Sequence, residues 1–61
     1  PSIHPLALVS PDAVLGEGVE VGPFCVVHPG VVIGEGTRLL SHVVVHTGST
    51  VGKRNVIHEG R

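Results

Sequence analysis

Aliphatic residues recur at every sixth position along this chain, without exception, from residue 3 to residue 57. The ten members of this column are Ile3, Val9, Leu15, Val21, Val27, Ile33, Leu39, Val45, Val51 and Ile57. A period of six fits neither an amphipathic helix, with its period of about 3.6 residues, nor the two-residue alternation of a plain strand. The pattern therefore indicates an internal repeat, and a flat antiparallel sheet is the less favoured alternative.

The other columns of the repeat predict short strands joined by corners. With the aliphatic residue as position one, Gly and Pro gather at positions two and three, and position three holds Pro5, Pro11, Pro23 and Pro29. Pro fixes φ and Gly permits positive φ, so we expect positions two and three to form the corner. Position five is mostly small and faces the same way as position one across a short strand, as in residues 7–9. Positions four and six should point outward.

Three such strands and three corners close a triangular coil of about 18 residues. The predicted fold class is therefore all-β, a short parallel β-helix of about three coils, with residues 1–61 forming a single hexapeptide-repeat domain. Residues one full coil apart should stack on neighbouring coils. Glu20 and Arg38 are spaced in this way, and we expect them to form an ion pair on a solvated face.

One outward face is apolar, which a small monomer should not leave in water. Its predicted members are Leu6, Leu8, Phe24, Val26, His42 and Val44. The single cysteine, Cys25, excludes an intrachain disulfide as a source of stability, and we expect it to be a buried core residue. We therefore predict that the chain's partner is itself, as a homotrimer about a threefold axis. End-to-end stacking of two trimers through unpaired strand edges is a weaker hypothesis.

Composition excludes several other partners. The formal charge is −1, Phe24 is the only aromatic residue of the Phe, Trp and Tyr class, and no apolar run is long enough to cross a bilayer. We expect neither nucleic-acid binding nor membrane insertion. No signal peptide is visible, so a cytoplasmic location is expected. Arg61 falls in a column that should face the core, which predicts either a frayed cap or a chain that continues.

Five histidines are the main candidates for chemistry. His28 and His46 lie one coil apart and should stack beside the apolar face, from which His42 points outward. These three could bind a ligand or a metal such as Zn²⁺, or act as bases near neutral pH. Packed, hydrogen-bonded rings are the favoured interpretation, and no cofactor is expected. The segments 16–18 and 34–36 (Gly-Glu-Gly) are interpreted as turns rather than phosphate loops, because no helix follows either.

Several segments carry a family resemblance that covers essentially the whole chain. They are residues 3–5 (IHP), 21–27 (VGPFCVV), 33–37 (IGEGT) and 41–45 (SHVVV). Within the hexapeptide-repeat acyltransferases, these segments resemble the N-terminal coils of the UDP-N-acetylglucosamine acyltransferase family of lipid A synthesis. The resemblance implies a left-handed parallel β-helix and a homotrimer that transfers an acyl group from acyl carrier protein to a sugar nucleotide between subunits.

The same resemblance implies that the family's catalytic histidine and most substrate contacts lie in later coils, so no catalytic residue is carried over to this chain. The expected function is a self-assembling trimeric core without acyltransferase activity of its own. Two alternatives stay open. One is a small trimeric enzyme that uses interface histidines, with or without a metal. The other is a module that binds a small acyl or sugar-nucleotide ligand between subunits.

Overall fold

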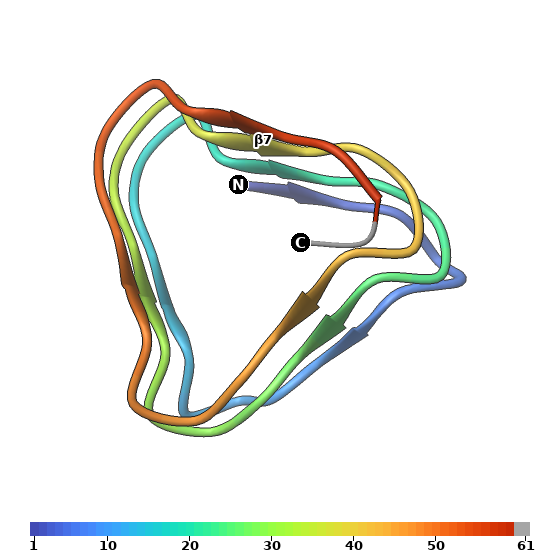
Figure 1. Cartoon of the computed structure of the whole chain (residues 1–61), viewed down its shortest axis with the longest axis horizontal. Helices are drawn as coiled ribbons and strands as arrows, with labels where there is room; N and C mark the ends of the chain where they lie inside the picture. The colour runs from blue at the N-terminus through green and yellow to red at the C-terminus, as the bar shows by residue number, and fades with distance from the viewer. Residues whose placement is uncertain (60–61) are drawn as a thin grey trace.

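The computed structural model describes residues 1–59, which wind into stacked triangular coils (Figure 1). Each coil has three straight sides, and a two-residue strand lies on each side. The strands are β1 (Ser2–Ile3), β2 (Leu8–Val9), β3 (Val14–Leu15), β4 (Glu20–Val21), β5 (Val26–Val27), β6 (Val32–Ile33), β7 (Arg38–Leu39), β8 (Val44–Val45), β9 (Thr50–Val51) and β10 (Val56–Ile57). Every strand therefore consists of position six of one repeat followed by position one of the next.

The strands form three parallel sheets, one on each side of the triangle. Their orders are β1-β4-β7-β10, β2-β5-β8 and β3-β6-β9. Strand partners lie 18 positions apart, as in Glu20 opposite Arg38 and Val27 opposite Val45. Each coil donates backbone N–H groups to carbonyls of the next coil, for example from Leu8 to Cys25 at 2.9 Å. The expected all-β parallel solenoid of about three coils is confirmed.

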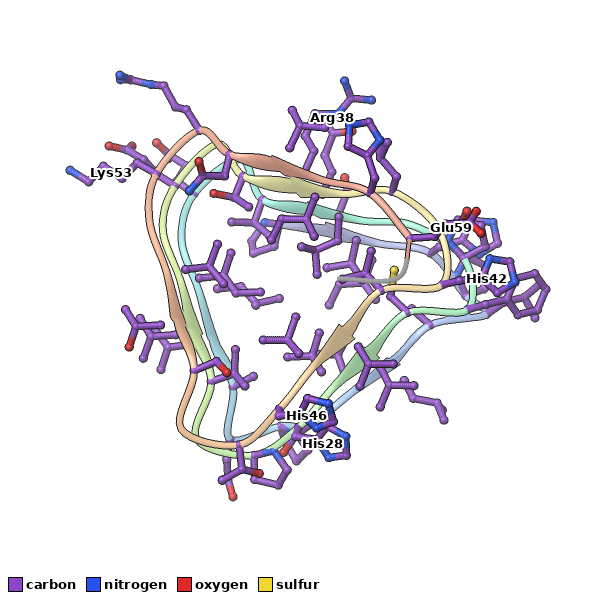
Figure 2. The ribbon with its side chains drawn as sticks, in the orientation of Figure 1. His28, Arg38, His42, His46, Lys53 and Glu59 are labelled. Atoms are coloured by element: carbon purple, nitrogen blue, oxygen red, sulfur yellow. The ribbon has the colours of Figure 1, made fainter. Side chains whose placement is uncertain are left out.

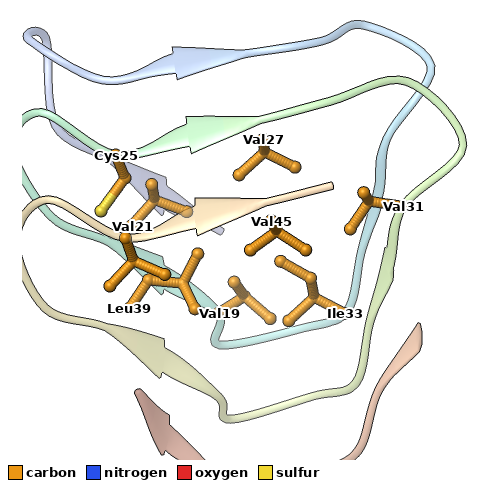
Figure 3. Packing of buried hydrophobic residues seen from close by; sticks show 9 residues of the cluster. Val19, Val21, Cys25, Val27, Val31, Ile33, Leu39 and Val45 are labelled. Atoms are coloured by element: carbon orange, nitrogen blue, oxygen red, sulfur yellow. The ribbon is translucent and has the colours of Figure 1, made fainter. Parts of the chain in front are cut away.

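The core fills the inside of the triangle with positions one and five (Figure 3). The side chains that are at most 6% exposed are Val19, Val21, Cys25, Val27, Val31, Ile33, Thr37, Leu39, Val43 and Val45. Thr37 is the only polar member of this set within the described residues. Its hydroxyl donates to the carbonyl of Gly52 at 2.6 Å and accepts from the Asn55 N–H at 3.3 Å, so its burial leaves no polar group unpaired.

The corner lies one residue later than the sequence pattern suggests. The turn is closed by bonds from position five to position two, such as Ser49 N–H to His46 O at 3.1 Å, so its two central residues are positions three and four. Positive φ values occur at position four: Gly18 (75°), Phe24 (61°), Gly30 (77°), Gly36 (73°), His42 (58°), Gly48 (84°) and Arg54 (53°). The placement of the corner at positions two and three is therefore wrong.

Glycine at position two meets a different requirement, because the next coil passes close to its Cα. A Cβ added at Gly22 would overlap the carbonyl oxygen of Leu40, and one added at Gly34 would lie 2.8 Å from the carbonyl carbon of Gly52. These glycines allow neighbouring coils to pack together without a side chain between them.

Two further expectations concern the ends of the chain and the membrane. The predicted inward position of Arg61 lies outside the described residues. Within residues 1–59 there is no helix with the length and apolar character needed to cross a bilayer.

Candidate functional site

The outer surface of the β2-β5-β8 sheet is apolar along its whole height. Leu8, Val26 and Val44 stand in one column, where Leu8 is 71% exposed, Val44 is 37% exposed and Val26 is half-buried. They point outward because position six lies next to the inward position one on a strand. The strands stack these three side chains in register, since Leu8 pairs with Val26 and Val26 with Val44.

The corner that precedes this sheet extends the apolar surface. Leu6 is 56% exposed and Phe24 is 53% exposed, and the ring of Phe24 stacks on that of His42 with centroids 5.1 Å apart. Phe24 and His42 both adopt positive φ, which is unusual for residues with large side chains. We call the six side chains of this corner and sheet the apolar strip: Leu6, Leu8, Phe24, Val26, His42 and Val44.

The other two sides of the triangle are less suited to a continuous contact. On the β1-β4-β7-β10 side, Arg38 Nε lies 3.5 Å from Glu20 Oε1, and both side chains are more than half exposed. This ion pair confirms the expected stacking of Glu20 and Arg38. On the β3-β6-β9 side, the apolar column of Val14 and Val32 ends at Thr50.

The structure brings together two of the three predicted histidines. The rings of His28 and His46 stack with centroids 5.5 Å apart and an angle of 11° between their planes. They lie at one end of the β2-β5-β8 side, while His42 lies at its other end, at the opposite corner (Figure 2). Position two follows each strand directly and precedes the turn at positions three and four, so the histidine pair lies where the β2-β5-β8 side runs into its next corner.

The other histidines stand alone. His4 and His58 share a column of position two, but Gly22 and Leu40 separate them on the intervening coils. His4 Nδ1 accepts a hydrogen bond from the backbone N–H of Leu6 at 3.0 Å. Within residues 1–59, no group of three or more His, Cys, Asp or Glu side chains is arranged to hold a metal ion.

Cys25 and the Gly-Glu-Gly segments have the structural roles expected of them. The Cys25 thiol is fully buried and lies 3.3 Å from the carbonyl oxygen of Leu40, so it packs as a small core residue. Residues 17–18 and 35–36 are turns on successive coils, joined by a bond from Gly36 N–H to Glu17 O at 2.9 Å.

A shallow hollow on the β1-β4-β7 side was not anticipated from the sequence. It has a volume of about 590 Å³, and its polar lining includes Ser2, His4, Glu20, Arg38 and Ser41. The pairing of Glu20 with Arg38 neutralises the charges in this lining. The hollow spans three coils, so adjacency in sequence gives no signal for it.

Comparison with known proteins identifies the six-residue period as the repeat of a known family. The family described as bacterial transferase hexapeptide (six repeats) matches residues 12–47, which is more than half of the chain. No curated protein matches the chain. The six-residue period, the parallel coils and this match agree, and the chain belongs to the bacterial transferase hexapeptide family.

Proposed function

We propose that this chain forms the self-assembling core of a homotrimeric, acyltransferase-like hexapeptide protein. The apolar strip supplies the contact between subunits. The observation that carries the proposal is the exposure of this strip, because Leu6, Leu8 and Phe24 are each more than half exposed on one side of a very small domain. Association removes such a surface from water.

A threefold arrangement suits the shape of the strip. It occupies one corner and the adjoining side of a triangular column. In a ring of three copies, the strip of one copy meets a different surface of its neighbour. Contacts between unlike surfaces close into a ring when the rotation is a simple fraction of a turn. Three triangular columns around one axis satisfy this condition and leave the Glu20–Arg38 side in solvent.

The resemblance to the UDP-N-acetylglucosamine acyltransferase family supports the finer parts of the proposal. In this proposal the coil is left-handed, and the chain belongs to the branch that acts on sugar nucleotides. The segments 21–27 and 41–45 carry this likeness. Because no catalytic residue of that family is carried over to residues 1–61, the chain by itself transfers no acyl group. A small acyl or sugar-nucleotide ligand would be held between subunits.

The test is the replacement Phe24→Glu, which places a charge at the centre of the apolar strip. The wild-type chain should sediment as a trimer, and Phe24→Glu should lose both the trimer and the folded β signal in circular dichroism. The matched control is Val14→Glu, on the β3-β6-β9 side, which is similarly exposed and should leave the trimer intact.

Two results would contradict the proposal. One is a wild-type chain that is folded and monomeric, and the other is a Phe24→Glu variant that is a well-folded monomer. The same trimer fraction, incubated with an acyl carrier protein thioester and UDP-N-acetylglucosamine, should give no acylated sugar nucleotide. Product formation would instead support the small-enzyme alternative.

A further inference from the structure

The pair formed by His28 and His46 is not explained by assembly through the apolar strip. Both residues follow the paired strands β5 and β8 directly, and the register that sets Val27 opposite Val45 also sets the two histidines on adjacent coils. Their rings lie nearly parallel, with an angle of 11° and centroids 5.5 Å apart. In the single subunit His46 is exposed and His28 is half-buried, so solvent and dissolved ions can reach the pair there.

The ring nitrogens of this pair are available to bind a ligand. Among residues 1–59, the hydrogen bonds to side chains include one to His4 Nδ1 but none to a ring nitrogen of His28 or His46. Each neutral imidazole therefore keeps one nitrogen with a free lone pair.

We propose that His28 and His46 together bind one divalent late transition metal ion of the class that prefers imidazole, with Zn²⁺ as the test ion. Imidazole nitrogens bind Zn²⁺ at about 2.0–2.1 Å, so two ligating nitrogens can lie at most about 4.2 Å apart. The lone pair of an imidazole nitrogen lies in the ring plane, so two nearly parallel rings 5.5 Å apart have to turn about their side-chain torsions before both nitrogens face one ion. Water molecules complete the coordination shell.

Within the described part of the chain no third His, Cys, Asp or Glu joins the pair, so the chain supplies two ligands and water supplies the others. Both ligands come from one subunit, so no residue of a neighbouring subunit is needed to complete the pair. The ion would connect strands β5 and β8 across neighbouring coils, so binding should stabilise the folded chain. Protonation of the imidazoles competes with the ion, so acidification should weaken binding.

The chain provides its own matched controls for a test. His4 and His58 also occupy position two, but neither has a histidine on a neighbouring coil. Isothermal titration of the full chain with Zn²⁺ should show a site that His28→Gln or His46→Gln weakens at least tenfold. The double variant should be little weaker than either single variant, because one ligand alone does not chelate. His4→Gln and His58→Gln should leave the affinity unchanged.

Nuclear magnetic resonance on the wild-type chain gives a second measurement that does not depend on the folding of any variant. Addition of Zn²⁺ should shift the imidazole signals of His28 and His46 together, at one shared midpoint, before those of His4 and His58. The proposal is wrong if all histidines titrate alike, or if the loss of His28 or His46 weakens binding no more than the loss of His4. Binding lost equally in all four variants would also overturn it.

Discussion

At the residue scale, the unusual feature is the kind of side chain held in a left-handed backbone conformation. Four of the seven residues with positive φ among residues 1–59 are glycines, but Phe24, His42 and Arg54 are not. An L-residue in this region costs roughly 1–2 kcal/mol relative to the right-handed region, and glycine avoids this cost. At Phe24 and His42 the same corner also gives two stacked rings 5.1 Å apart on the apolar strip. Strain retained at such a place points to a role for the side chain.

Replacement of Phe24 by glycine separates strain from assembly. Phe24→Gly should relieve the backbone strain at φ 61°. It should nevertheless lower the association constant of the trimer at least tenfold, because the ring is removed from the apolar strip. Sedimentation equilibrium measures this constant. Arg54→Gly relieves a similar backbone at φ 53° on a corner away from the strip. It should keep the trimer and raise the free energy of unfolding by about 1 kcal/mol. An unchanged trimer in Phe24→Gly would show that the strip is not the interface.

At the element scale, the close approach of the residues that follow β4 and β7 gives a further prediction. Gly22→Ala should prevent the coils from stacking, because the new Cβ would overlap the carbonyl oxygen of Leu40, a backbone atom that cannot swing aside. Gly52→Ala should be tolerated within about 1 kcal/mol, since among residues 1–59 its new Cβ meets a side-chain atom, the amide nitrogen of Asn55 at 3.3 Å, and no backbone atom. Thermal unfolding of both variants by circular dichroism checks this. Equal melting temperatures would contradict the role given to Gly22.

The sequence predicts the pairing between coils better than it predicts the position of the corner. The six-residue period was sufficient to predict the three sheets, their register and the Glu20–Arg38 ion pair, because all three depend only on spacing. The identical rule also brings Lys53 Nζ to 3.6 Å from Glu35 Oε1, which was not anticipated. The corner lies one residue later than predicted, because the glycines at position two do not have positive φ. At position two, glycine is needed where the backbone of the next coil passes too close for a Cβ. The sequence of one repeat contains no sign of this contact.

For the candidate site, the sequence predicts which histidines stack but not the chemistry of the pair. His28 and His46 share a column, so their stacking follows from the period and is confirmed. His42 occupies position four, and its distance from the pair depends on where the corner lies. Metal binding by the pair is a proposal that spacing alone does not establish. The same column holds Ser10 in the first coil, so a place in this column does not require histidine.

At the scale of the whole molecule, burial depends on having a coil on each side. In the column of position one, Val21 and Leu39 are 3% and 2% exposed, while Ile3 in the first coil is 46% exposed. Stability in such an array comes from each repeat plus its contacts with neighbours, so three coils leave much of the core at an end. Small domains of this size commonly depend on association for further burial.

This dependence predicts that unfolding is linked to protein concentration. If the subunit is stable only within the trimer, a tenfold rise in concentration stabilises each subunit by about 0.9 kcal/mol, which is two thirds of the roughly 1.4 kcal/mol that a tenfold change represents. For a chain of this length, that shift should raise the melting temperature by about 4–8 °C. Calorimetry over a hundredfold range of concentration measures it. If the apolar strip rather than ion pairs holds the subunits, as proposed, added salt should not lower the midpoint. A melting temperature that is independent of concentration would mean that a single subunit is stable alone. The exposure of the apolar strip would then need another explanation.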